Sequence, residues 1–151
     1  MDDALLRLLI ERATARRDEA AGSAADARRV RDAAAGTLRT LTDYREESLG
    51  RAPVRARAGV GVEQLKAAGR FDAKLIAAIR QQYDVHAQRA LEADTREATL
   101  VERQRRLMAL QTLEKRRASE AAARAARRDQ RAIDEHATLM AARRRPGPER
   151  S

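Results

Sequence analysis

The chain has 151 residues and a formal net charge of +9, with 36% charged and only 2% aromatic residues. Alanine supplies much of the 43% apolar fraction, and alanine buries little area although it favours helix more than any other residue. This composition excludes a core rich in large side chains, disulfides and thiol chemistry (there is no cysteine), and it is typical of long helices and coiled coils.

The N-terminal residues show no targeting signal. Asp2 and Asp3 stand where a secretion signal would have basic residues. The apolar run that follows is interrupted by Arg7 and ends at Glu11, so it is too short to span a membrane. We therefore expect a cytoplasmic protein without membrane insertion.

Two long helices are predicted, and no segment has the period-two alternation of a strand. The first covers about residues 3–50, because glycine suits a helix end and proline cannot continue one at Gly50-Arg51-Ala52-Pro53. Gly59 and Gly61 extend this break into a linker over 51–61. The second helix covers about 62–142 and precedes a disordered tail over 143–151. These segments predict an all-α fold with a single domain, residues 1–151, in which the two helices form an antiparallel coiled-coil hairpin and the second helix is longer.

Both helices carry apolar residues at alternating spacings of three and four, the pattern of a coiled-coil seam. In the second helix the pattern runs from Ile76 to Leu139, and twelve of its nineteen positions are apolar. In the first helix nine of thirteen positions are apolar, and the predicted seam residues are Leu6, Leu9, Ala13, Arg16, Ala20, Ser23, Ala27, Val30, Ala34, Thr37, Leu41, Tyr44 and Ser48.

The predicted helices differ in length. At ~1.5 Å per residue the first spans ~70 Å and the second ~120 Å. Folding back about residues 51–61 leaves roughly the last thirty residues of the second helix, from Glu114 onward, beyond the start of the first. This predicted overhang is rich in arginine and needs a partner.

The sequence holds no constellation typical of a catalytic or metal site. His86 and His136 lie fifty residues apart without cysteines, whereas a metal site needs three or four converging ligands. Gly59-Val60-Gly61 lacks both the third glycine and the preceding strand of a nucleotide-binding loop. We therefore expect no enzyme activity, no metal and no cofactor.

Arginine tracts such as Arg116-Arg117 and Arg127-Arg128 suggest contact with phosphates. Acids including Glu114, Glu120 and Asp129 lie between these tracts, whereas helices that bind nucleic acid usually keep a basic stretch free of acids. Nucleic acid is not expected as a partner, but a basic helical hairpin that binds it stays an alternative.

Tyr44 and Phe71 are two of only three aromatic residues. Folding about residues 51–61 places Leu41 and Tyr44 beside Phe71, Leu75 and Ala78. These five side chains either pack within the hairpin or form a surface patch for a partner. The rarity of aromatic residues elsewhere favours the patch.

The stretch from Leu38 to Met140 resembles the FliJ family of the bacterial flagellar type III export apparatus. Four segments, in this order and spacing, carry the resemblance: Leu38-Arg39-Thr40-Leu41-Thr42-Asp43-Tyr44; Phe71, Leu75, Ile79 and Gln82; Arg105-Arg106-Leu107-Met108-Ala109-Leu110-Gln111-Thr112-Leu113; and Arg128-Asp129-Gln130 with Asp134, Glu135 and Ala137. No single segment is specific to the family, because coiled coils resemble one another. The order and spacing of the four segments over about a hundred residues are much more persuasive.

The resemblance implies an antiparallel coiled coil similar to the central stalk of rotary ATPases. It implies binding to a hexameric export ATPase, to the cytoplasmic domain of the membrane export gate and to export chaperones. The expected location is the cytoplasmic side of the inner membrane at the flagellar base. The implied ATPase-binding tip consists of Leu5, Leu6, Leu9, Ile10, Arg128, Asp129, Gln130, Ile133, Asp134 and Glu135.

The resemblance also implies that the export gate binds Leu41, Tyr44, Phe71, Leu75 and Ala78. The chain departs from the family at Ser48, where many relatives have a second tyrosine, and in the linker 51–61. The equivalent stalk of a virulence-type type III secretion system is the alternative within the same class.

Overall fold

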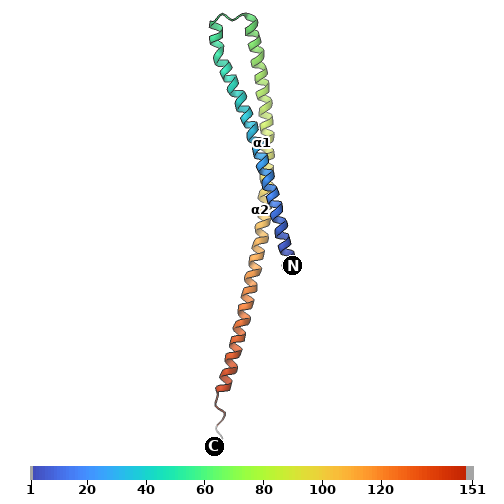
Figure 1. Ribbon diagram of the computed structural model, residues 1–151, viewed down its shortest axis with the longest axis vertical. Coiled ribbons are helices and arrows are strands. Elements are labelled where there is room, and N and C mark those ends of the chain that lie inside the picture. The colour runs from blue at the N-terminus through green and yellow to red at the C-terminus, as the bar shows by residue number, and fades with distance from the viewer. Residues whose placement is uncertain (1, 149–151) are drawn as a thin grey trace. The chain divides into compact units, whose positions relative to one another are not determined.

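The computed structural model describes residues 2–148 and contains two helices over that range. Helix α1 runs over Asp3–Arg57 and helix α2 over Val62–Arg144 (Figure 1). The predicted all-α hairpin with a longer second helix is confirmed. In the described part of the chain, neither helix has a stretch apolar and long enough to cross a bilayer.

The described residues of the two helices divide into two compact units. The turn unit, residues 12–105, contains most of α1, the connection and the first half of α2. The terminal unit contains residues up to Glu11 together with those from Arg106 onward. Each unit pairs part of α1 with part of α2.

The connection between the helices is shorter than the predicted linker 51–61. Helix α1 continues through Pro53 to Arg57, seven residues beyond Gly50. Proline removes a single backbone donor, which a long helix tolerates at a cost, whereas Gly59 at φ +74° adopts a conformation that ends a helix. The prediction therefore placed the end of the first helix too early.

The start of α2 is capped by a side chain. Gln64 Oε1 accepts a hydrogen bond from the Gly61 N–H at 3.1 Å, the reciprocal half of a capping box. The Gly61 carbonyl accepts bonds from the N–H groups of Gln64 and Leu65, both at 3.1 Å. At the other end of α2, Arg143 and Arg144 are helical and residues 145–148 are not, and residues 149–151 of the predicted tail lie outside the described range.

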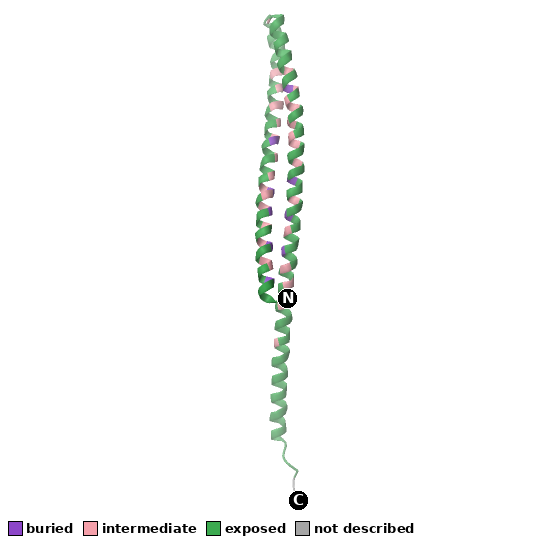
Figure 2. Cartoon of the chain, turned by 90° about the vertical axis from the view of Figure 1, so that its right-hand side faces the viewer, coloured by how far each residue is buried: buried purple, intermediate pink, exposed green. Residues whose placement is uncertain are grey.

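Nine of the thirteen predicted seam residues of α1 are buried or half-buried. Buried and half-buried side chains follow alternating spacings of four and three from Leu6 to Ser48, and Figure 2 shows them on the side of α1 that faces α2. Arg16, Val30, Thr37 and Tyr44 are exposed. One residue further along, Arg17, Arg31, Leu38 and Arg45 are half-buried in place of these four predicted residues. Ile10 and Ala24 are also covered, but the predicted residues beside them, Leu9 and Ser23, are half-buried as well.

Arginines in the seam explain this difference. Arg17, Arg31 and Arg45 have side chains only 34–36% exposed. An arginine can bury its aliphatic stem against a neighbouring helix while its guanidinium reaches water. A prediction that looks for apolar residues rejects these arginine positions and assigns the neighbouring residue to the seam instead.

The seam of α2 follows the prediction from Ile76 to Leu107, where every predicted residue except Tyr83 and Gln104 is buried or half-buried. Beyond Leu107, the half-buried residues Leu110, Leu113 and Arg117 lie one residue earlier than predicted, whereas Ala125 is half-buried as predicted. The shift follows Leu110 and Leu113, whose side chains bury more apolar area than the predicted Gln111 and Glu114 would.

The core of the turn unit is thin. Ala24 is fully buried and clusters with Ala20 and Leu100, with Ala21 packed against them. Alanines allow the two helices to approach closely, but their methyl groups contribute little burial energy. The few leucines of the seam therefore carry a large share of the stability.

Gly59→Ala is expected to lower the free energy of unfolding by about 1 kcal/mol, because alanine is strained at φ +74°. Gly69→Ala is the matched control, since Gly69 lies inside α2 with open space around its α-carbon. There alanine is expected to raise the free energy of unfolding by ~0.5–1 kcal/mol. Urea titration followed by circular dichroism measures both, and equal effects would contradict this account of the turn.

Candidate functional site

Polar contacts fix the register of the turn unit. Arg45 on α1 forms an ion pair with Asp72 on α2, donating from Nε to Oδ1 at 3.0 Å and from a terminal nitrogen to Oδ2 at 3.4 Å. Gln82 Nε2 donates to the backbone carbonyl of Ala34 at 3.1 Å, a contact that the small alanine side chain permits. These contacts join α1 to α2 beside the aromatic pair and further from the turn.

Tyr44 and Phe71 pack edge to face, with ring centroids 6.0 Å apart and planes at 80°. Both rings remain accessible, at 51% and 44% exposure. Of the other three residues of the predicted gate-binding patch, Leu75 is buried, and Leu41 and Ala78 are half-buried. The surface of the patch therefore consists chiefly of the two rings.

A groove of about 300 Å³ runs beside the aromatic pair. We call it the aromatic groove, and it is lined by Tyr44, Glu47, Ser48, Arg51, Arg55, Gln64, Ala67, Ala68 and Phe71. The sequence analysis missed the role of Arg51 and Arg55, because it assigned them to the linker. Their spacing of four from each other and from Glu47 is the signal that places them on one helix face.

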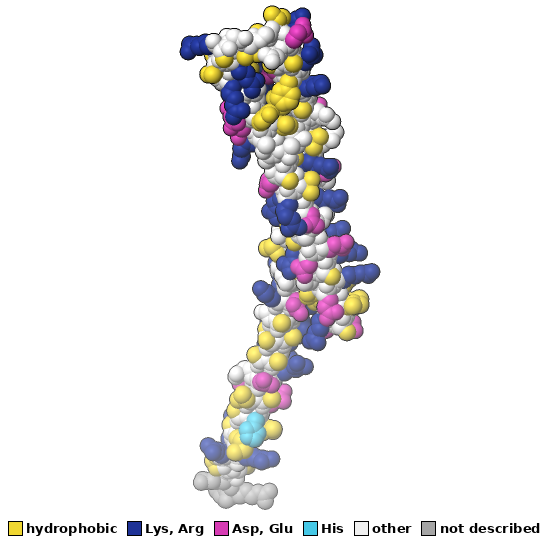
Figure 3. All heavy atoms as spheres, turned by 45° about the horizontal axis from the view of Figure 1, so that its top comes forward, with side chains coloured by type: hydrophobic (Ala, Val, Ile, Leu, Met, Phe, Trp, Pro, Cys, Tyr) yellow, Lys and Arg dark blue, Asp and Glu magenta, His cyan; other side chains and the backbone are white. Residues whose placement is uncertain are grey.

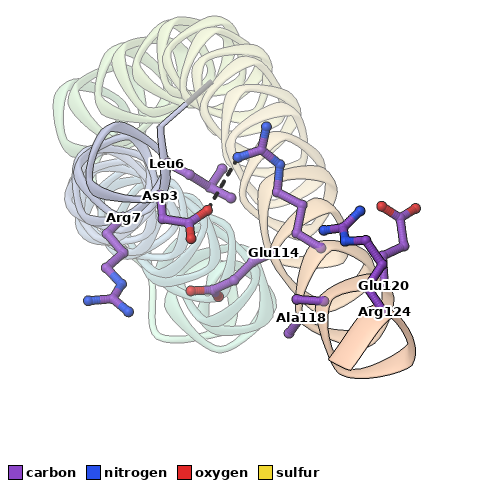
Figure 4. A pocket seen from close by; sticks show the side chains of 9 residues that line it. Asp3, Leu6, Arg7, Glu114, Ala118, Glu120 and Arg124 are labelled. Atoms are coloured by element: carbon purple, nitrogen blue, oxygen red, sulfur yellow. Dashed lines mark hydrogen bonds and ion pairs between the residues drawn. The ribbon is translucent and has the colours of Figure 1, made fainter. Parts of the chain in front are cut away.

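The terminal unit holds a second groove, of about 520 Å³, which lies between the first turns of α1 and residues 114–124 of α2 (Figure 4). Leu6 is buried there, and Arg117 donates to Asp3 Oδ1 at 3.5 Å. The groove carries both signs of charge, and its lining residues are Asp3, Leu6, Arg7, Glu114, Arg117, Ala118, Glu120, Ala121 and Arg124.

The part of α2 without a facing helix begins later than predicted. Residues of α2 as far as Arg124 line the groove with Asp3 and Leu6, and every described residue from Ala126 onward is exposed (Figure 2). The sequence analysis expected the overhang to start at Glu114. The difference arises because α1 is longer and the turn lies later than predicted. Asp3 therefore faces residues of α2 that are nearer the C-terminus than expected.

The predicted ATPase-binding residues fall into two groups, both in the terminal unit. In the first turns of α1, Leu5 is exposed, Leu6 is buried, and Leu9 and Ile10 are half-buried. In α2, Gln130 Nε2 donates to Asp134 Oδ1 at 2.9 Å, and Ile133 is 62% exposed between them. The other predicted residues of α2 are also exposed: Arg128, Asp129 and Glu135.

The described residues contain no group of three or more histidine, cysteine, aspartate or glutamate side chains that could hold a metal ion. His86 is half-buried in the seam of the turn unit, and His136 is exposed on α2. The grooves described above are open and carry charged side chains, and their residues are suited to contact with another macromolecule.

Comparison with known proteins agrees with this arrangement. Neither a curated protein nor a solved structure matches the chain at a significant level. The sequence model of the family described as flagellar FliJ protein matches residues 3–146, nearly the whole chain. The match spans both helices and both grooves. The chain therefore belongs to the flagellar FliJ family and is a component of the flagellar protein export apparatus.

Proposed function

We propose that the chain is a non-enzymatic adaptor that joins the hexameric export ATPase to the cytoplasmic domain of the membrane export gate. In this role it also helps to handle export chaperones, and it works on the cytoplasmic side of the inner membrane at the flagellar base. The observation that carries the proposal is the exposed end of α2. From Ala126 to Arg144 no described residue of α1 covers it.

The end of α2 has the features of a helix that binds a partner. Ile133, Leu139 and Met140 expose apolar side chains among charged ones. A helix gains most of its stability in water from packing an apolar face, so a helix end without a facing helix is expected to gain stability on docking. We assign this segment, with Leu5 of α1, to the export ATPase.

The charges on this segment favour a protein partner over nucleic acid. Around Ile133, between residues 120 and 135, four arginines are balanced by four acids: Arg124, Arg127, Arg128 and Arg131, with Glu120, Asp129, Asp134 and Glu135. With Arg143 and Arg144 the whole segment Ala126–Arg144 has a net charge of only +2. A phosphate-binding surface would carry a net positive charge, since most of its affinity comes from neutralising phosphates. A balanced surface with exposed apolar side chains suits a protein interface.

The aromatic groove supports the second half of the proposal. Exposed aromatic rings and arginines are the residue types that contribute most to protein interfaces, and here Tyr44 and Phe71 lie beside Arg51 and Arg55. We assign this groove to the export gate. The ATPase and the gate would then bind different units of the chain.

Phe71→Ala is expected to weaken binding of the cytoplasmic gate domain by roughly 10–30-fold, because truncating a central aromatic residue of an interface costs about 1.5–2 kcal/mol or more. Binding to the ATPase is expected to stay unchanged. Isothermal titration of the full chain with each partner separately measures both affinities.

Tyr83→Ala is the matched control, since Tyr83 is an exposed aromatic residue of the same helix outside the groove. Its effect on gate binding is expected to be within about twofold. Equal weakening by both substitutions, or none by Phe71→Ala in a folded chain, would contradict the assignment of the groove.

A further inference from the structure

The residues around the connection between the helices carry an unbalanced positive charge. Residues 49–70, which we call the basic turn, contain five basic residues and one acid, Glu63. Four of the nine net positive charges therefore lie within about a seventh of the chain. The basic residues are Arg51, Arg55, Arg57, Lys66 and Arg70.

These bases have few counter-ions. In the described part of the chain only Lys66 of the five forms an ion pair, with Glu63 at 3.7 Å, and both side chains are exposed. Some arginines elsewhere do have an acidic partner, as Arg45 has Asp72 and Arg89 has Glu92. The charge of the basic turn is thus available to a negatively charged partner.

Aliphatic side chains accompany these charges. Val54 and Val62, on either side of the connection, are each 67% exposed, and Leu49 and Leu65 are nearly half exposed. Every residue of the basic turn except Val60 is exposed. Figure 3 shows apolar and basic side chains together at this end of the turn unit.

We propose that the basic turn binds the surface of an anionic lipid bilayer. Arg57, Lys66 and Arg70, which do not line the aromatic groove, would lie at the level of the lipid phosphates. Val54 and Val62 would enter the boundary between headgroups and acyl chains. Basic residues combined with exposed apolar ones are the features of surfaces that bind at this boundary. The proposal goes beyond the adaptor role and does not depend on it.

The composition of the basic turn favours a bilayer over nucleic acid. Aliphatic side chains gain free energy when they leave water for acyl chains, and a duplex offers them no comparable environment. Phosphate contacts alone would be expected beside polar residues such as serine or asparagine. Here four exposed aliphatic residues lie among the five bases.

The test uses the full chain and vesicles of phosphatidylcholine containing about a third phosphatidylglycerol, with pure phosphatidylcholine vesicles for comparison. The wild-type chain is expected to sediment with the anionic vesicles only. The double variant R57Q/K66Q is expected to bind ~25-fold more weakly, at about fivefold per charge. Neither residue lines the aromatic groove, so gate binding separates this result from the adaptor proposal.

The matched control is R127Q/R131Q, which removes the same charge from exposed positions of α2 in the terminal unit. It is expected to bind the vesicles like the wild type. V54S/V62S is expected to weaken binding while leaving its salt dependence unchanged, because it removes the apolar contribution alone.

Three outcomes would overturn the proposal. One is absence of binding to anionic vesicles. Another is equal weakening by R57Q/K66Q and R127Q/R131Q, which would show that the charge of the whole chain is responsible. The third is tight binding of a duplex DNA at ~150 mM salt that R57Q/K66Q abolishes and V54S/V62S leaves intact, which would assign the basic turn to nucleic acid.

Discussion

Replacing Leu100 by alanine is expected to lower the free energy of unfolding by about 2–3 kcal/mol. Leu100 is the large side chain in the cluster with Ala20 and Ala24, so alanine would leave a cavity that neighbouring methyl groups cannot fill. Because native domains are stable by only ~5–15 kcal/mol, this change removes a substantial fraction of the total. Urea titration followed by far-ultraviolet circular dichroism at low temperature measures it.

Leu91→Ala is the control for this prediction. Leu91 lies in the same helix and is 68% exposed, so its replacement is expected to change the free energy of unfolding by less than about 0.5 kcal/mol. Similar losses for the two variants would mean that α1 does not pack on Leu100, and the seam described for the turn unit would then be wrong.

Ile133→Asp is expected to reduce stimulation of the export ATPase at least ~10-fold at a fixed concentration of the chain. A new carboxylate at the centre of the proposed contact would have to be buried without a partner, which costs more than the loss of the apolar side chain alone. Since Ile133 is 62% exposed, the fold of the free chain should not change. ATP hydrolysis by the purified ATPase of the same export system, measured against the concentration of added chain, gives the effect.

Met108→Asp provides the matched substitution. Met108 also lies on α2 in the terminal unit and is 64% exposed, but it is outside the proposed tip. Stimulation by this variant is expected to equal that of the wild type. If Met108→Asp abolished stimulation and Ile133→Asp did not, the ATPase contact would have to be reassigned to the paired part of α2.

The sequence alone predicted the fold class, the antiparallel pairing and the greater length of α2, because helix propensity and a period near 3.5 are strong over long segments. It placed the turn incorrectly because Pro53 is a stronger general signal than Gly59. Only the backbone conformation shows that α1 passes through the proline. The late start of the overhang follows from the same difference.

The sequence predicted only part of the seam of α1. Alanine occurs on several faces of the helix, so it does not show which of two neighbouring residues belongs to the seam. The choice therefore depended on a few large residues such as Val30 and Tyr44. The structure instead buries the stems of Arg17 and Arg31, which a count of apolar residues treats as exposed.

The candidate surfaces were predicted in outline. Tyr44 and Phe71 do meet, because both lie near the turn, where the register error has little effect. Leu6 and Leu75, which the sequence analysis assigned to the two surfaces, are buried. Arg51 and Arg55 were missed, since their place beside the aromatic pair requires that α1 extend past Gly50.

The adaptor role is tested most directly by a chain that ends at Ala125, which retains the seam of the turn unit and the groove around Leu6 and Arg117. Its stimulation of the export ATPase should be measured beside its affinity for the gate domain. The account predicts that stimulation is lost while gate binding and the urea midpoint of the turn unit are retained. Undiminished stimulation by the shortened chain would contradict the assignment of the end of α2 to the ATPase.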